Sequence, residues 1–327
     1  MKISDRYQEI MHSDFKEELC GMIKQKQALG FKYESQIQML VGFDRYICDQ
    51  FGNTLELTKE IAESWVEAGS TTEKKRRRAL LIHQFGEYLH QIGRPAYLYP
   101  KRKYRAPSKY IPYIFTKEQI NTIFQFADNA VSITTSNKRK GSCEATAMIL
   151  KMLYGCGLRI SEALQLRIKD IDLDTGVLKI WDSKYHKDRL VPMSTSLHQS
   201  IANYVSKSYD DNAYLFSDSG IIPYNRATIY SRFRDIIFNC NIPHRGKGHG
   251  PRLHDFRHTF AVHSLKQLAD SGEDIYTVLP VLSKYMGHSS VSATQYYLRL
   301  TSEMYPDVIK QVDNYFGDVY PEVFTDD

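Results

Sequence analysis

The sequence predicts a mainly α-helical protein with a small antiparallel β-sheet, an α+β fold divided into two domains. Three observations predict it. Apolar residues recur at helical spacing along most of the 327 residues. Short β-type runs flanked by turn residues occur around residues 177–192. Prolines and basic residues interrupt the pattern at residues 93–113, and a single core rarely grows beyond about 250–300 residues, so two domains are expected.

The first domain, residues 1–92, is predicted to be all α-helical. Gly30 and Gly52 follow helical stretches and are typical helix ends. Helices are therefore expected at residues 14–29 and 33–51, from Thr58, and from Thr72 to Ile92. The apolar face of the last helix is predicted to consist of Leu81, Phe85, Tyr88, Leu89 and Ile92.

A basic interdomain linker is predicted at residues 93–113. Its prolines cannot continue a helix interior, and Lys, Arg and Tyr fill the spaces between them. The second domain, residues 114–302, then begins with Thr116 and Gln119 in the spacing of a helix-capping box. We expect the linker to be extended and able to lie along a polyanion.

The second domain is predicted to be helical around one small sheet, with a polar surface loop at residues 131–141 and a flexible basic loop at 243–252. The predicted helices cover residues 142–154 and 160–166 and resume near Ser194, and the two strands cover 177–181 and 189–192. The last segment, residues 303–327, carries seven acids and one base and has an apolar series partly at helical spacing.

Composition favours a soluble protein of a reducing compartment. The five cysteines are scattered without disulfide or CxxC spacing, no signal peptide is evident, and no apolar run approaches the roughly 18–20 residues that span a bilayer. We therefore expect a cytoplasmic protein with no membrane partner.

Basic charge is concentrated in the first part of the chain. Residues 1–110 hold 19 Lys/Arg against 14 Asp/Glu, which accounts for the whole net charge of +5. Within them, residues 74–109 carry 11 basic residues and one acid. Such a stretch is often only a solvated face, but it also suits DNA phosphates. The candidate DNA-binding residues are Lys74, Lys75, Arg77, Arg78, Lys101, Arg102, Lys103 and Arg105.

Four segments of the second domain carry residues suited to phosphodiester chemistry. That chemistry needs a nucleophile, donors that hold the phosphorane oxygens, and an acid for the leaving 5′-oxygen. Arginine suits the second task because its planar fork binds two oxygens and stays charged. The segments are G-L-R-I-S-E-A-L at 157–164, K-x-x-K-x-R-x-V-P at 184–192, H-x-x-R-H at 254–258, and G-H-S-S at 287–290 followed by Tyr297.

These motifs, in this order and spacing, resemble the tyrosine recombinases, also called the phage integrase family. The resemblance covers residues 115–300 and is weaker over the helical, basic first hundred residues. It implies a SAM-like, all-α core-binding domain followed by the catalytic domain, in a C-shaped clamp. Residues 279–288 and 297–301 look more like recombinases of mobile elements than enzymes of chromosome-dimer resolution.

Carried over by position, the resemblance implies one role for each candidate catalytic residue. Tyr297 would attack the scissile phosphate and form a 3′-phosphotyrosyl bond. Arg159 and Arg257 would clamp the non-bridging oxygens. Lys184 would protonate the 5′-oxygen, and His254 would take part in acid/base work on the tyrosine. His288 would bind a phosphate oxygen.

The resemblance also implies partners and an overall activity. The protein would be a site-specific recombinase or integrase acting on double-stranded DNA with specific recombination sites, without metal, ATP or another cofactor. It would be a tetramer on DNA, a monomer free in solution, and nucleoid-associated in a bacterial cytoplasm. The acidic tail, residues 303–327, would dock on a neighbouring protomer, although periodicity alone also allows it to fold back on its own domain.

Several assignments keep a structural alternative. Arg159 could merely cap a helix or pair with Glu162, which we interpret as structural. Lys187 competes with Lys184 on the same hairpin. Tyr296 adjoins Tyr297, and because neighbouring helical side chains point about 100° apart, only one can reach the phosphate. The His-to-Tyr spacing of the family selects Tyr297.

Two other functions and one metal site are also considered. A type IB topoisomerase-like relaxer would use the same chemistry as a monomer, and a catalytically inactive accessory protein would only bind DNA. A zinc site among His249, His254, His258, His263 and Cys240 lacks HExxH or CxxC spacing, so His258 and His263 are interpreted as structural.

Overall fold

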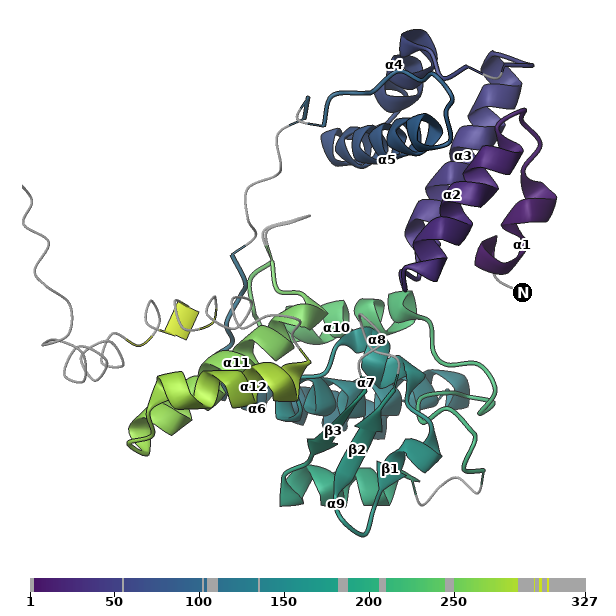
Figure 1. The fold of residues 1–327 in the computed structure, drawn as a ribbon. Helices are drawn as coiled ribbons and strands as arrows, with labels where there is room; N and C mark the ends of the chain where they lie inside the picture. The colour runs from purple at the N-terminus through teal and green to yellow at the C-terminus, as the bar shows by residue number, and fades with distance from the viewer. Residues whose placement is uncertain are drawn as a thin grey trace, which may run out of the picture. The chain divides into compact units, whose positions relative to one another are not determined.

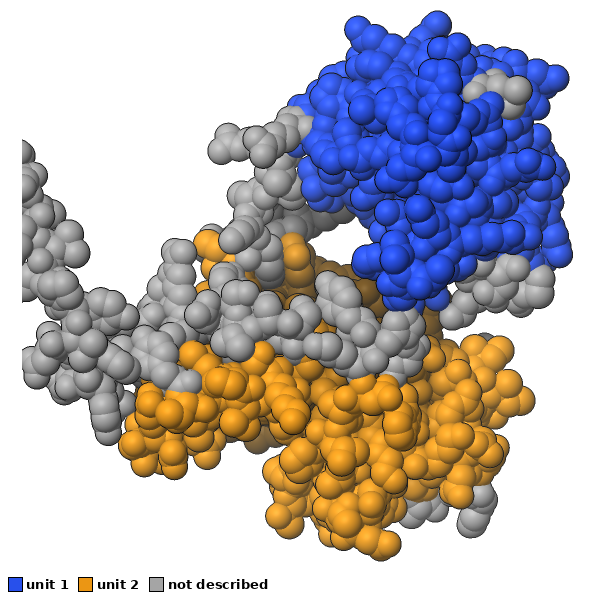
Figure 2. All heavy atoms as spheres, viewed as in Figure 1, with its two compact units in different colours: residues 1–110 blue, residues 111–327 orange. Residues whose placement is uncertain are grey.

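The computed structural model describes most of the chain in two compact units. They comprise residues 1–110 and 111–327, coloured separately in Figure 2. The described residues are 3–54, 56–101, 103–104, 111–134, 136–181, 188–205, 210–244, 250–287, 297, 300–301 and 305. In this described part, no helix is both long enough and apolar enough to cross a bilayer.

The described part of the first unit is a helical bundle. Its helices are α1 (Ile3–Ile10), α2 (Lys16–Ala28), α3 (Glu34–Gln50), α4 (Lys59–Glu67) and α5 (Thr72–Gln91). Threonines begin two of them, because the hydroxyl of Thr58 accepts the amide of Ile61 and that of Thr71 accepts the amide of Lys74. The sequence predicted both starts to within one residue, and it predicted the ends of α2 and α3 equally well.

An aromatic cluster forms the centre of this bundle. The rings of Phe43 and Trp65 lie 4.8 Å apart, and Phe85 contacts Phe43 and Phe15 edge-on at 6.0 and 5.6 Å. Leu81, Phe85 and Leu89 of the predicted apolar face are buried. Ile92 is 46% exposed because α5 ends before it, so its inclusion in that face was wrong.

The described part of the second unit consists of helices around one small sheet (Figure 1). Its helices are α6 (Lys117–Ile133), α7 (Asn137–Gly155), α8 (Ile160–Gln165), the 3-10 turn η1 (Ile168–Asp170), α9 (Thr195–Val205), α10 (Arg226–Asn239), α11 (Leu253–Asp270) and α12 (Ile275–Met286). The strands β1 (Ile171–Asp172), β2 (Val177–Ile180) and β3 (Arg189–Pro192) pair antiparallel in the order β1-β2-β3.

Helix α7 is the central element of this unit, in contact with α6, α8, α9, α10 and α11. Its residues Ile149, Leu150 and Met152 are fully buried in the main core. A second apolar cluster joins α11 to α12 and includes Tyr297 and Leu300. Figure 1 shows α11 and α12 side by side, which brings the H-x-x-R-H segment next to the end of α12.

The predicted fold class is confirmed, with three local differences. Residues 131–141 are not a loop, because α6 continues to Ile133 and α7 begins at Asn137. Ser132, Arg139 and Lys140 are exposed near the ends of these two helices. The sheet has a third short strand, β1, just before a turn in which Gly176 adopts a φ of +68°. Helix α1 was not predicted.

Candidate active site

Arg159 lies at the junction of α7 and α8, where a glycine permits a tight approach. Gly157 has a φ of +59°, and a Cβ atom there would lie 2.5 Å from the ring of Phe260 on α11. The chain can therefore turn against α11 only with glycine at this position. Arg159 follows as the residue that precedes the first turn of α8, as the sequence predicted.

The Arg159 side chain is held in place by hydrogen bonds at both ends of its guanidinium. Nη1 donates to Glu162 Oε1 at 2.6 Å and Nη2 donates to the carbonyl of Gly287 at 3.0 Å. Its amide donates to Glu162 Oε2 at 2.9 Å. Arg159 thus does pair with Glu162, and with 19% of its side chain exposed it still faces solvent.

Arg257 lies deeper in the same place. It is 1% exposed, and its Nη1 and Nη2 donate to the carbonyls of Gly157 and Met286, both at 2.6 Å. Its Nε has no hydrogen-bond partner among the described residues. Burial, together with the repulsion from Arg159, lowers the pKa of Arg257 to about 10, so the side chain remains charged at neutral pH with donors to spare.

A third arginine, Arg189 at the start of β3, completes the cluster. Its Nη1 and Nη2 donate to the two carboxylate oxygens of Glu162 at 3.0 and 2.8 Å, and its Nε donates to the carbonyl of Tyr285 at 2.9 Å. Burial by itself raises the pKa of Glu162, but the bonds and charges of Arg189 and Arg159 outweigh it and hold the pKa at about 2. Glu162 is therefore ionised.

His254 and Tyr297 lie on either side of a second histidine. The ring of His258 is 4.7 Å from that of His254 and 5.4 Å from that of Tyr297. Tyr297 is 3% exposed, within the cluster that joins α11 and α12. Its charge, if ionised, would raise the pKa of Arg257, which places the two side chains within electrostatic reach.

His254 is neutral at neutral pH. Its side chain is exposed, yet the surrounding protein removes part of its hydration, and the cations of Arg257 and Arg159 act in the same direction. Together they lower its pKa from 6.5 to about 4. The two cations alone would favour the neutral ring, so the pKa of His254 would be lowered even without burial.

These charges make the site an anion receptor. Three arginines, Arg159, Arg189 and Arg257, stand against one carboxylate, Glu162, while His254 is neutral. The excess of positive charge suits a phosphodiester, whose oxygens accept hydrogen bonds from guanidinium groups. Tyr297 supplies a hydroxyl beside this charge.

The comparisons with known proteins agree with this arrangement. The model of the phage integrase family matches residues 114–304, more than half of the chain. The chain belongs to the phage integrase family. It is thus a tyrosine recombinase, an enzyme of site-specific DNA recombination. This confirms the family to which the sequence motifs pointed.

The relatives of the recombinase cover between about half and nearly all of the chain. A putative integrase/recombinase, y4rB, of Sinorhizobium fredii is 28% identical over 324 residues, covering 94% of this chain and 99% of the relative. The tyrosine recombinase XerA of Pyrococcus furiosus is 30% identical over 168 residues, covering 51% and 54%. A structure of the XerH recombinase bound to a palindromic difH substrate has a TM-score of 0.59 at 15% identity, covering 94% and 93%.

Two predicted catalytic residues, together with the alternative to one of them, lie outside the described part of the chain. They are Lys184 and its competitor Lys187 on the hairpin between β2 and β3, and His288 after α12. Tyr296, the alternative nucleophile, is also outside it. The flanking residues Arg189 and Gly287 are described, and both contact the arginine cluster.

His263, one residue of the considered zinc site, has a different role. Its Nδ1 is 3.0 Å from the hydroxyl of Tyr154, which ties α11 to α7. Among the described residues, no group of three or more His, Cys, Asp or Glu is arranged to hold a metal ion. His263 thus has the structural contact that the sequence suggested, whereas His258 lies inside the candidate site.

The basic residues of the first unit divide into exposed and paired groups. Arg77 is exposed, and the exposed Lys74 donates a hydrogen bond to the hydroxyl of Ser70 at 3.1 Å. Lys101 pairs with Glu87 at 2.9 Å. Arg102 and Arg105 lie outside the described residues.

Two of the paired lysines share one carboxylate. Lys75 and Lys103 lie 2.8 and 3.4 Å from Glu67, which also accepts a hydrogen bond from Tyr104. The bond from Lys75, above all, lowers the pKa of Glu67 to about 2. These lysines are therefore partly neutralised before any DNA arrives.

Arg78 is turned toward its own unit. Its Nη1 donates to the carbonyl of Trp65 at 2.6 Å, and its guanidinium lies 5.0 Å from the centre of the Trp65 ring. Burial lowers its pKa. This arrangement is that of an arginine that stabilises the bundle, unlike the exposed Arg77 beside it.

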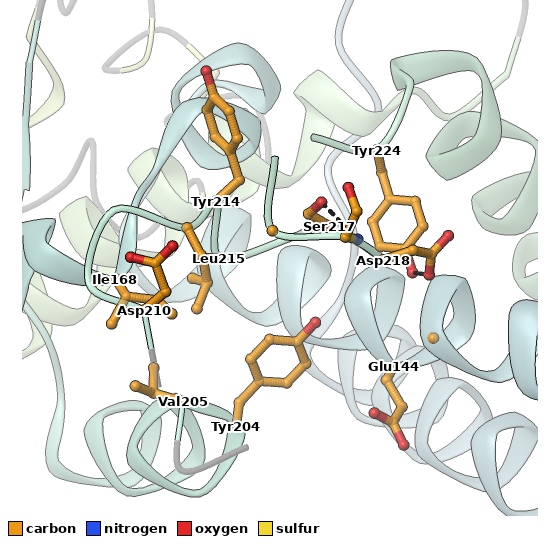
Figure 3. Close-up of a pocket in the computed structure, with 14 residues that line it drawn as sticks. Glu144, Ile168, Tyr204, Val205, Asp210, Tyr214, Leu215, Ser217, Asp218 and Tyr224 are labelled. Atoms are coloured by element: carbon orange, nitrogen blue, oxygen red, sulfur yellow. Dashed lines mark hydrogen bonds between the residues drawn. The ribbon is translucent and has the colours of Figure 1, made fainter. Parts of the chain in front are cut away.

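A pocket of about 630 Å³ lies elsewhere in the second unit and shares no lining residue with the arginine cluster. Figure 3 shows Tyr204, Tyr214 and Tyr224 around it, together with the carboxylates of Glu144 and Asp218. Acidic groups disfavour a phosphate there. The arginine cluster therefore remains the candidate active site, and this pocket does not.

Arg189 is the residue that sequence reasoning missed. It is the arginine of the K-x-x-K-x-R-x-V-P motif, and only the lysines of that motif were given roles. The available signal was its position as the first residue of a strand, directly after the lysine-bearing loop. Glu162, interpreted as structural, proves to be the shared partner of Arg159 and Arg189.

Proposed function

We propose that the recombinase cleaves and rejoins DNA through a covalent 3′-phosphotyrosyl bond to Tyr297. The observation that carries the proposal is the excess of arginine charge beside a tyrosine hydroxyl on the elements that bear the family motifs. Arg159, which keeps 19% of its side chain exposed, and the spare donors of Arg257 bind the non-bridging oxygens of the scissile phosphate.

The cleavage step is a balanced transesterification. The hydroxyl oxygen of Tyr297 attacks phosphorus, and its proton passes to neutral His254. The bond from phosphorus to the 5′-oxygen breaks, and this oxygen takes a proton from Lys184. His288 donates to a phosphate oxygen. The roles of Lys184 and His288 rest on the family motif, since both lie outside the described residues.

Rejoining follows from the same chemistry. A 5′-hydroxyl attacks the phosphotyrosyl bond, and each proton returns along its path. One phosphodiester bond forms for each that breaks, so the energy of the bond is kept in the protein–DNA link. The proposal therefore requires neither ATP nor a metal ion, because the arginines supply the charge that stabilises the phosphorane.

The proposed substrate is double-stranded DNA that carries specific recombination sites. The XerH neighbour is bound to a palindromic difH substrate, and the y4rB relative is named as a putative integrase/recombinase. In our proposal residues 1–92 bind the core of the site and residues 93–113 link the domains. Residues 114–302 carry out catalysis in a DNA-bound tetramer, in which residues 303–327 dock on a neighbour. Action on a mobile element and a nucleoid-associated location stay predictions.

The test uses a duplex nicked near the scissile phosphate, which traps the covalent adduct. Wild-type protein and Tyr296→Phe should form the adduct, whereas Tyr297→Phe should bind the same duplex and form none. An adduct in Tyr297→Phe would overturn the assignment. Relaxation of supercoiled DNA by a monomer, without exchange between paired sites, would instead support the topoisomerase-like alternative.

A further inference from the structure

The end of α12 is covered by three arginines, each bound to a different carbonyl. Arg189 Nε donates to the carbonyl of Tyr285 at 2.9 Å, Arg257 Nη2 to Met286 at 2.6 Å, and Arg159 Nη2 to Gly287 at 3.0 Å. The last carbonyls of a helix lack partners within the helix and carry its negative dipole end. Three cations satisfy them here, so this helix end organises the arginine cluster.

Arg189 differs from the other two in how its donors are used. Its fork faces Glu162 in a bidentate pair at 3.0 and 2.8 Å, and only 7% of its side chain is exposed. Because both terminal nitrogens of Arg189 pair with the oxygens of one carboxylate, its charge is already balanced by an anion, whereas those of Arg257 bind uncharged carbonyls. Arg159 keeps more of its side chain exposed, at 19%. The geometry therefore separates an arginine that faces the substrate from one that supports it.

The contact between Arg189 and Gly287 is close-packed. Gly287 has a φ of +68°, and a Cβ atom there would lie 2.9 Å from Nη1 and 3.2 Å from Cζ of Arg189. Tyr285 adds a second tie to the same strand, because its hydroxyl donates to the carbonyl of Pro192 at 3.0 Å. Strand β3 is thus fixed to α12 at its first and last residues.

We propose that Arg189 is a positioning residue for cleavage, acting through Glu162 on Arg159 and through Tyr285 and Gly287 on the end of α12. This inference rests on the proposed function of Arg159 and Tyr297. Arg189 begins the strand that follows Lys184 in the sequence, and it pairs with Ile180 of β2. One side chain therefore connects Glu162 and the proposed phosphate clamp with strand β3 and the end of α12.

The first test substitutes lysine, which keeps the charge and loses the fork. Arg189→Lys should bind the duplex with unchanged affinity and slow single-turnover cleavage by about 10–10²-fold, the loss expected when a catalytic group is displaced by about 1 Å. The matched control is Arg167→Lys, since Arg167 binds the carbonyl of Asn212 and stacks on Tyr214 away from the cluster. It should cleave at the wild-type rate.

The second test asks whether Arg189 acts through Arg159. If it does, Arg189→Lys added to Arg159→Lys should cleave within about threefold of Arg159→Lys alone, because residues in one network are not additive. Gly287→Ala, which pushes on the same contact from the other side, should reproduce the Arg189→Lys phenotype. If the rate losses of Arg189→Lys and Arg159→Lys multiplied in the double variant, the proposal would be overturned.

Folding is checked on the same samples. Urea unfolding gives the folded fraction of Arg189→Lys, and a binding assay gives its DNA affinity. After the cleavage rate is corrected for both, it should still be lower than that of the wild type. A defect that disappears on this correction would assign Arg189 to stability alone and reject the inference. Wild-type cleavage by Arg189→Lys, while Tyr297→Phe stays inactive, rejects the inference and leaves the proposed function standing. Activity of Tyr297→Phe rejects the proposed function itself.

Discussion

The two units both carry many arginines and lysines, but they hold them in opposite ways. In the second unit Arg159, Arg189 and Arg257 are fixed by one carboxylate and by main-chain carbonyls, with between 1% and 19% of the residue or side chain exposed. In the first unit the lysines around Glu67 lie at the surface, where 29–39% of their side chains is exposed.

This difference separates two uses of positive charge. Surface ion pairs contribute little to stability and rearrange easily, so they can exchange a carboxylate for a DNA phosphate. A buried arginine with fixed donors costs desolvation, yet it presents those donors without reorganisation when charge develops on a phosphorane. In our proposal, the first arrangement supplies affinity without sequence preference, and the second supplies catalysis.

The largest expected effect comes from Arg257. Arg257→Lys removes the fork that joins the carbonyls of Gly157 and Met286 and that, in our proposal, holds the scissile phosphate with its remaining donors. Single-turnover cleavage should fall by about 10²–10³-fold, the usual loss of one preorganised donor group. DNA affinity should change little. Quenched-flow cleavage of the nicked duplex measures the rate.

Arg257→Lys also leaves buried carbonyls short of donors, which costs about 1–3 kcal/mol of unfolding free energy each. Urea unfolding must therefore accompany the rate measurement. A rate loss below tenfold in folded protein would show that Arg257 is a structural link between α7, α11 and α12 and would contradict its proposed role.

The second effect concerns pH and His254. Its pKa is about 4 in the folded protein against 6.5 for an ordinary histidine, so the unfolded chain binds the proton more readily. The contribution of His254 should leave stability unchanged above about pH 6.5 and lower it as pH falls from there toward 4. Because His254 stays neutral above its pKa, it should remain available as the base for cleavage down to about pH 5.

An NMR titration of the His254 ring provides the measurement. Arg159→Gln removes one of the cations that lower the pKa, so it should raise the pKa of His254 toward 6.5. A wild-type pKa near 6.5, or no shift in Arg159→Gln, would contradict the environment described for this histidine.

Much of the site could be predicted from sequence because short motifs determine its local structural features. The start of α8 at Arg159, the capping box at Thr116, strand β3 and the placement of His254 at the start of α11 all follow from neighbouring residues. These features need no knowledge of distant contacts.

The sequence could not predict which side chains far apart in the chain contact one another. Arg189 meets Glu162 across 27 residues and Tyr285 across 96, and Arg78 turns to Trp65 rather than to solvent. Periodicity places a residue on a helix face, but the direction of a long, flexible side chain depends on what packs beside it.

The third prediction sharpens the comparison inside the first unit. Lys74→Ala with Arg77→Ala should lower the salt dependence of DNA binding by up to about 0.9 log unit for each phosphate that is no longer bound. Lys75→Ala with Lys101→Ala should lower it less, because Glu67 and Glu87 already hold these lysines. Affinity measured over a range of salt gives both slopes, and equal slopes would mean that DNA displaces the carboxylates.

The smallest effect is expected for Arg78. It tests whether this arginine stabilises the bundle of the first unit or, as the sequence suggested, binds DNA. Its bond to the carbonyl of Trp65 and its position over that ring stabilise the bundle, so Arg78→Ala should lower the unfolding free energy of the first unit by about 1–3 kcal/mol. Arg77→Ala, one residue away and exposed, should leave stability within about 0.5 kcal/mol. The salt slope of DNA binding should respond in the reverse order. If Arg78→Ala flattened the slope and left stability unchanged, its guanidinium would have to leave Trp65 for DNA, and Arg78 would return to the DNA-binding set that the sequence suggested.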